Sequence, residues 1–242
     1  MSTEKQFVAS PESKAKAKQL RLFALLAWMV AIAGQVFAIL KLISDETLTY
    51  LIIAIVVLLA LALTGSWLWK KANRLDPASE KDKVKFFFQN QFGAIMGVLS
   101  FLPLVILILT NKDIEGKTKG IAGAIAVIAM LVAGISGVDF DPPSIEKYTK
   151  EINEQTDVVR KLNFDNDNVF WTRAGNRYHI FEECQHIRGR DEINNGSVKD
   201  SWDEKGISEL CKTCQARAMR ERNIQDADIE MPILEGEDVL ED

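Results

Sequence analysis

Residues 22–40 read LFALLAWMVAIAGQVFAIL, a stretch without a single charged side chain. Three further uncharged runs follow before Asp139, at 47–69, 86–111 and 120–138. An α-helix rises about 1.5 Å per residue, so each run can cross a hydrocarbon core of about 30 Å. Helices are the expected form because lipid cannot satisfy free backbone groups. We therefore predict a four-helix membrane bundle over residues 21–140, with spans at about 22–40, 48–69, 92–110 and 120–138.

The averages over the whole chain hide this division. The 242 residues have a net charge of −5 and a mean hydropathy of 0.00. Residues 1–141 carry 15 Lys and Arg against 11 Asp and Glu, whereas residues 142–242 carry 14 against 23. A mildly basic membrane part is thus followed by an acidic, hydrophilic part.

Positive side chains are distributed unevenly between the two sides of the predicted membrane. Eleven Lys and Arg lie before the first span and in the connection 70–85, and the opposite side holds only four, Lys41, Lys112, Lys117 and Lys119. Cytoplasmic loops are enriched in Lys and Arg. We therefore expect a multi-pass protein of the cell membrane with both termini in the cytoplasm. The first span lacks the flanks of a cleaved signal peptide and is expected to be retained.

The predicted spans contain no ionisable side chain, although carriers and pumps usually keep such groups inside the membrane. Their most polar residues are Gln35, Thr64, Ser66 and Ser100, which we interpret as partners in hydrogen bonds between helices. The fourth span is rich in Gly and Ala and can approach a neighbour closely, either within the bundle or in a second subunit. A channel or transporter regulated by the soluble part remains an alternative.

The three cysteines of the chain lie in the hydrophilic half. With one histidine they follow the pattern H-x4-C-x26-C-x2-C, formed by His179, Cys184, Cys211 and Cys214. Zinc prefers four tetrahedral thiolate and imidazole ligands. Thiols stay reduced in the cytoplasm, and an odd number of cysteines argues against a disulfide framework. We therefore predict that these four residues bind Zn2+.

Four protein ligands would leave no open position for water, which is typical of a structural zinc site. A domain of about 60 residues has a small core, and zinc contributes roughly 10–16 kcal/mol of apparent binding free energy in small modules. His186 is the competing imidazole. It lies two residues after Cys184 and would need a cramped C-x-H chelate, so His179 is preferred.

A wider set of residues surrounds this pattern: Phe170-Trp171-Thr172, Gly175, Tyr178-His179, Cys184, Ile187 and Cys211-x-x-Cys214. The set resembles the "YH…C…CxxC" module found at the ends of many bacterial membrane and secreted proteins, which is similar to the Ada-type metal-binding fold. The resemblance covers about residues 168–216, with Leu210 where a proline often stands. It implies a small zinc-binding α+β module in a bacterial protein. It does not imply DNA repair, because the Ada methyl-acceptor chemistry depends on a four-cysteine site. The helical half resembles four-helix membrane proteins of bacteria.

The other segments complete the predicted domain plan. Residues 169–172 and 177–180 have strand composition on either side of a turn, which predicts a β-hairpin, and 215–224 is expected to be a final helix. The predicted fold is a membrane all-α four-helix bundle followed by a small α+β zinc-binding domain. Its parts are an N-terminal tail at 1–20, the bundle at 21–140, a linker helix at 141–163, the zinc-binding domain at 164–224 and an acidic disordered tail at 225–242.

These features favour a membrane-anchored zinc module that serves protein interaction or assembly and is not an enzyme. Its expected partners are the lipid bilayer and a protein partner or a second copy of the chain. Residues 163–224 carry 10 Lys and Arg against 11 Asp and Glu, so no nucleic-acid partner is expected. A redox enzyme that uses Cys211 and Cys214 as a dithiol is a further alternative. The sequence offers no catalytic or cofactor-binding constellation beyond the metal ligands.

Overall fold

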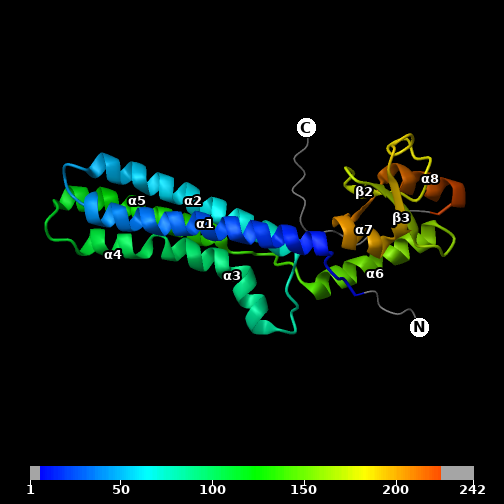
Figure 1. Cartoon of the computed structure of the whole chain (residues 1–242), viewed down its shortest axis with the longest axis horizontal. Helices are drawn as coiled ribbons and strands as arrows, with labels where there is room; N and C mark the ends of the chain where they lie inside the picture. Colours follow the sequence, from blue (N-terminus) through cyan, green and yellow to red (C-terminus); the bar gives the residue numbers. More distant parts are fainter. Residues whose placement is uncertain (1–5, 225–242) are drawn as a thin grey trace. The chain divides into compact units, whose positions relative to one another are not determined.

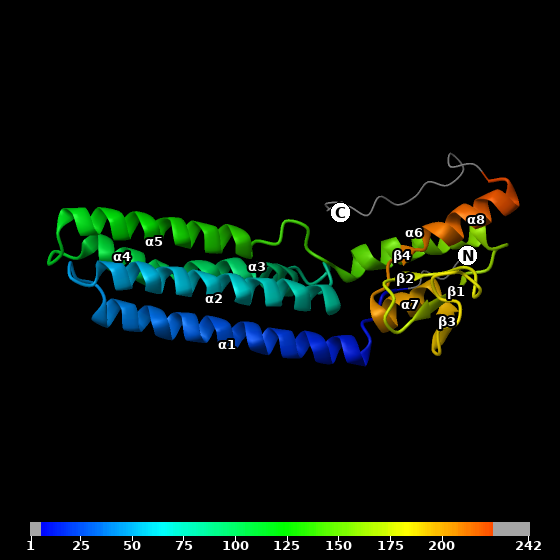
Figure 2. The same cartoon turned by 90° about the horizontal axis from the view of Figure 1, so that it is seen from above.

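The computed structural model describes residues 6–224, and these fall into two compact units. One unit comprises residues 15–142 and is built from helices. The other comprises residues from 143 onward together with the N-terminal segment up to Lys14. The helices of the first unit run alongside one another in both views (Figures 1 and 2). The predicted acidic tail, 225–242, lies outside the described residues.

The helical unit contains four helical segments that are long and apolar enough to cross a membrane, as predicted. They are Pro11–Lys41, Leu48–Leu75, Lys83–Thr110 and Gly116–Gly137. The helices themselves are α1 (Pro11–Lys41), α2 (Leu48–Leu75), α3 (Lys83–Leu99), α4 (Leu102–Thr110) and α5 (Gly116–Gly137). The first three segments extend beyond the predicted apolar runs because their charged ends are helical too.

The third segment is divided into α3 and α4 at Pro103. α3 ends at Leu99, and α4 begins at Leu102 with the proline in its first turn. Proline lacks an N–H and clashes with the preceding turn, so it breaks a helix interior but suits a first turn. The Ser100 hydroxyl and its backbone N–H both donate to the carbonyl of Met96, at 2.8 and 3.0 Å, at the end of α3.

Large apolar side chains cover the outward faces of these helices. Phe37, Ile53, Ile128 and Ile135 are each 55–61% exposed. Monomeric soluble proteins rarely expose apolar surface over such a large area, whereas lipid accommodates it. The exposed faces therefore agree with the membrane interpretation that length and composition give.

Small residues bring α3 and α5 into close contact. A Cβ atom added to Gly97 would lie 2.6 Å from the carbonyl oxygen of Ala133, and one added to Gly137 would lie 2.4 Å from the carbonyl carbon of Gly93. The helix backbones thus approach each other as they do at small-residue interfaces in membranes. The Gly-rich face of the fourth span, for which the sequence left two interpretations open, packs within the bundle along this stretch.

The second unit has one long helix, shorter helices and four short strands in its described part. In chain order they are α6 (Ile145–Leu162), β1 (Asn168–Thr172), β2 (Arg177–Tyr178), β3 (Ile193–Ser197), α7 (Val198–Lys205), β4 (Glu209–Leu210) and α8 (Lys212–Arg222). Their apolar side chains form one core that includes Trp171, Ile187 and Trp202. The small α+β unit predicted after the helices is therefore present.

The role of α6 differs from the linker predicted at 141–163. Ile152, Val159 and Leu162 lie at helical spacing on one face and are each fully buried in the core of the unit. The compact unit accordingly begins at 143 rather than at 164. Gln155 interrupts the apolar face, which weakened the amphipathic pattern in the sequence.

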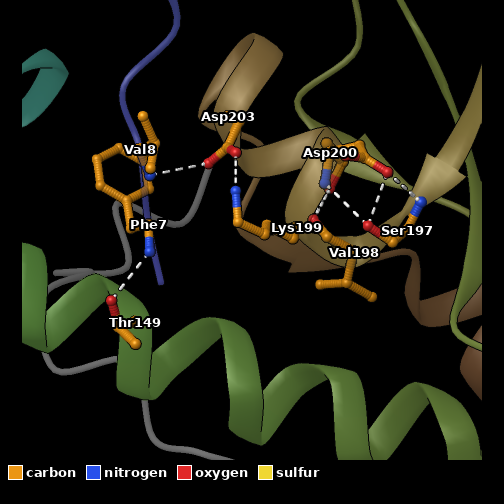
Figure 3. A network of polar contacts seen from close by, with 9 residues as sticks. Phe7, Val8, Thr149, Ser197, Val198, Lys199, Asp200 and Asp203 are labelled. Carbon is orange, nitrogen blue, oxygen red and sulfur yellow. Dashed lines mark hydrogen bonds and ion pairs between the residues drawn. The ribbon is translucent and has the colours of Figure 1, made fainter. Parts of the chain in front are cut away.

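The N-terminal segment belongs to the same core. Phe7 is 6% exposed, and its ring meets Tyr148 of α6 edge-on at a centroid distance of 5.1 Å. The backbone N–H of Phe7 donates to Thr149 Oγ1 at 3.0 Å, and that of Val8 donates to Asp203 Oδ1 at 3.3 Å, as Figure 3 shows. The segment just before α1 is therefore clipped onto α6 and α7 of the second unit.

We expect Gly97→Ala to destabilise the bundle by about 1–3 kcal/mol, because the added methyl group meets a backbone carbonyl that cannot move aside freely. Gly120→Ala is the matched control, since a Cβ atom there meets nothing within 4 Å. Thermal unfolding in detergent micelles measures both. Equal midpoints for the two variants would show that α3 and α5 are not in close contact.

We expect Phe7→Ala to release the N-terminal segment, because truncation of a buried phenylalanine costs about 3–5 kcal/mol in a protein core. Hydrogen–deuterium exchange should then accelerate in peptides that cover Thr149 and Asp203. The control is Val8→Ala, whose side chain is 55% exposed. Unchanged exchange in Phe7→Ala would contradict the clipped arrangement.

Candidate metal centre

Two short pairs of strands build the frame of the candidate site. β1 pairs antiparallel with β3, from Asn168 opposite Ser197 to Thr172 opposite Ile193. β2 pairs in parallel with β4. Of the predicted hairpin between 169–172 and 177–180, one bridge remains, in which Phe170 and His179 exchange two backbone hydrogen bonds of 2.7 Å. The main partner of β1 is β3, which the sequence did not reveal because its residues, INNGS, are mostly polar.

The parallel pair sets the first two candidate ligands side by side. Tyr178, the last residue of β2, is in register with Leu210, the last residue of β4. The next residues along the chain are His179 and Cys211. The Cys211 N–H donates to the Tyr178 carbonyl at 2.9 Å and continues the pairing by one bond. The register of two short strands thus brings together residues that are far apart in the sequence.

The other two candidate ligands follow in tight turns. Cys184 lies in a turn in which its N–H donates to the Phe181 carbonyl at 3.1 Å and its carbonyl accepts from Ile187 N–H at 2.9 Å. Cys214 lies in the first turn of α8, for which Cys211 is the N-cap residue. This helix starts at Lys212, three residues earlier than predicted.

The structure brings all four predicted residues together in the interior. The donor atoms of His179, Cys184, Cys211 and Cys214 all lie within 4.8 Å of one another, and each of the four residues is buried. His179 Nδ1 is 3.7 Å from the sulfur of Cys214. Ligand atoms around a tetrahedral zinc ion are separated by roughly 3.5–3.8 Å, as Zn–S bonds near 2.3 Å and Zn–N bonds near 2.0 Å require. Three thiols and an imidazole at these separations could therefore hold a metal ion.

His186, the alternative imidazole, stands apart from this cluster. Its side chain is exposed, and its Nε2 lies 3.1 Å from Thr213 Oγ1. Its ring centroid is 6.3 Å from that of His179. The preference for His179 therefore agrees with the geometry.

Burial controls the protonation of the cluster when no metal is bound. It lowers the pKa of His179 to about 4, with the charges of His186 and Arg177 acting in the same direction. It raises the pKa of the Cys214 thiol to about 12, although backbone hydrogen bonds from Phe181 and Ile180 act in the opposite direction. At neutral pH the imidazole is thus free to bind a metal ion, while this thiol must release its proton as it binds one.

The raised pKa of Cys214 disfavours this cysteine as the attacking thiolate of a dithiol pair. Reactive dithiols carry a cysteine whose pKa is lowered, which makes the nucleophilic thiolate available. The pKa of Cys214 is raised instead. The three cysteines are free thiols in the structure.

A buried polar hub holds the strand of His179 in place. Gln155 Oε1 of α6 accepts hydrogen bonds from the Tyr178 hydroxyl and from Trp202 Nε1 of α7, each at 3.1 Å. Tyr178, beside His179, is thereby tied to two helices. A glutamine in a polar helix gives no signal of this kind in the sequence, so Gln155 was missed as a supporting residue.

A second contact fixes the Cys184 turn to α8. Arg217 Nη1 donates to Glu183 Oε1 at 2.9 Å, its Nε donates to Glu221 Oε1 at 2.8 Å, and its guanidinium stacks on Phe181 at 4.1 Å. Hydrogen bonding lowers the pKa of Glu183, partly through Arg217. One arginine thus connects the turn that carries Cys184 with the helix that carries Cys214.

No protein-family model matches this chain, and neither do the curated proteins or the solved structures with which it was compared. Functional inference therefore depends on the site and on the helices that accompany it.

Proposed function

We propose that the chain is an integral membrane protein that presents a structural zinc module for protein interaction or assembly. The observation that carries the proposal is the buried cluster of His179, Cys184, Cys211 and Cys214, with donor atoms within 4.8 Å of one another. Three thiols and an imidazole are nitrogen and sulfur ligands. Such a set binds zinc in preference to Mg2+ or Ca2+, which favour oxygen ligands.

A structural role follows from the number of ligands. Four protein donors complete a tetrahedral shell, so the ion has no position left for a water molecule or a substrate. Zinc would supply charge neutralisation for the thiolates and would crosslink the His179–Cys184 segment to the start of α8. We expect most of the folding free energy of this small unit to come from that crosslink.

The membrane placement rests on the four apolar helical segments and on the charge pattern. The N-terminal segment and the C-terminal unit share one core, which supports the proposal that both ends of the bundle lie on one side of the membrane. A chain that crosses the membrane an even number of times has both ends on the same side. The excess of Lys and Arg on that side favours the cytoplasm, where thiols stay reduced and can bind zinc.

Transport is the second candidate function, and the interior of the bundle gives it little support. Ser66 Oγ donates to the Gly93 carbonyl of α3 at 3.3 Å, a bond between helices as predicted, whereas Thr64 is exposed and its Oγ1 donates to the Ala60 carbonyl of its own helix at 2.8 Å. These hydroxyls are engaged by backbone, as expected for structural polar residues in membranes. Gln35 is 2% exposed, and its Nε2 has no hydrogen-bond partner in the described part of the chain.

Replacement of Cys211 by serine tests the metal proposal. We expect the purified full chain to contain about one zinc ion and Cys211→Ser to lose it, because a hydroxyl is a poor zinc ligand. Hydrogen–deuterium exchange of the backbone amides should then accelerate across α6–α8, while the amides of α1–α5 stay protected. Elemental analysis and hydrogen–deuterium exchange provide the two measurements.

His186→Ala is the matched control for the imidazole ligand and should keep its zinc, whereas His179→Ala should lose it. Loss of zinc from His186→Ala alone would reverse the assignment of the histidines. A C-terminal unit that remains protected in zinc-free Cys211→Ser would contradict a structural role for the metal.

A further inference from the structure

A cavity of about 420 Å3 opens beside the candidate metal centre. It is lined by residues of the turn after β1, by residues at the start of α8 and by two metal-ligand candidates, His179 and Cys211. The polar side chains that line it are Thr172, Asn176, Arg177, His186, Lys212 and Thr213. The cavity extends beyond the metal-ligand candidates to Thr172, Asn176 and Lys212, so it offers space for a ligand besides the metal ion.

The lining is rich in hydrogen-bond donors and positive charge. Arg177 and Lys212 contribute two cations, and no carboxylate is among the described residues that line the cavity. Lys212 is exposed and makes no ion pair within the described part of the chain. Arg177 pairs with Glu209 through Nε at 2.9 Å, which leaves its two terminal nitrogens as further donors.

His186 and Thr213 contribute neutral polar groups on the same wall. Their Nε2 and Oγ1 atoms are 3.1 Å apart, so each limits the rotation of the other. Asn176 contributes an amide from the facing turn. His186 thus lies outside the metal cluster but belongs to the lining of the cavity.

We propose that this cavity binds an oxyanion, namely a carboxylate or phosphate group carried by a ligand or partner. The inference rests on the proposed zinc module and assigns it a ligand class. Charge-assisted hydrogen bonds from lysine and arginine to such groups are among the strongest polar contacts in proteins. A zinc ion with three thiolates and a neutral imidazole carries a net charge of −1. Because Arg177 already pairs with Glu209, Lys212 is the cation that could offset this charge instead of binding an anion. The test must therefore distinguish binding of an oxyanion from compensation of the charge of the metal centre.

The experiment uses the zinc-loaded full chain in a neutral detergent and measures binding by calorimetry. The probes are inorganic phosphate and a short uncharged peptide with a free C-terminal carboxylate, compared with the same peptide amidated. We expect millimolar or tighter binding of at least one oxyanion and none of the amide. Binding of phosphate alone or of the carboxylate alone identifies the source of the group.

Lys212→Gln should weaken this binding about tenfold or more, as the loss of a charged hydrogen bond predicts. Arg220→Gln is the matched control, because it removes the same charge from an exposed position on the same helix. Asn176→Ala, away from the metal ligands, should also weaken binding and remains informative if Lys212→Gln affects the metal. Zinc content is measured for every variant.

Two results would overturn the proposal. One is the absence of phosphate and carboxylate binding in the zinc-loaded protein, and the other is equal binding by Lys212→Gln and Arg220→Gln. In the second case Lys212 only balances the charge of the metal centre. A wild-type chain without zinc would instead contradict the proposed function, so the two failures are distinguishable.

Discussion

Three thiols and an imidazole leave water together when the C-terminal unit folds, and groups of this kind are costly to bury without a partner. A single metal ion would satisfy all four. It would also close the long connection between Cys184 and Cys211, which contains β3 and α7. β2 and β4 are only two residues long each, so a metal crosslink at their ends would stabilise their pairing. The parallel register supplies the geometry, and a bound metal ion would supply free energy that stabilises it.

Two other segments, α6 and the N-terminal segment, complete the core around the candidate metal centre. α6 provides the apolar face and the Gln155 hub, and the N-terminal segment adds Phe7 to the same core. The chain therefore connects the unit to the helical part at two places, immediately before α1 and after α5.

Much of the fold could be predicted because its signals are strong and local. Long uncharged runs reveal the four spans, and the spacing of His179, Cys184, Cys211 and Cys214 reveals the cluster. The contacts that determine the remaining parts of the fold join residues that are distant in the sequence. The β1–β3 pairing relies on a polar strand, and all of α1–α5 separates Phe7 from its partner Tyr148 along the chain. α7 had a local signal, the Ser197–Asp200 capping box at its N-terminus.

The central claim is that the four residues bind one zinc ion in a closed tetrahedral shell. X-ray absorption at the zinc edge of the purified full chain measures the ligand set directly. We predict three sulfur neighbours at about 2.3 Å and one nitrogen neighbour at about 2.0 Å. A shell with a water or carboxylate oxygen in place of one of these donors, or a protein that purifies folded without metal, would contradict the account.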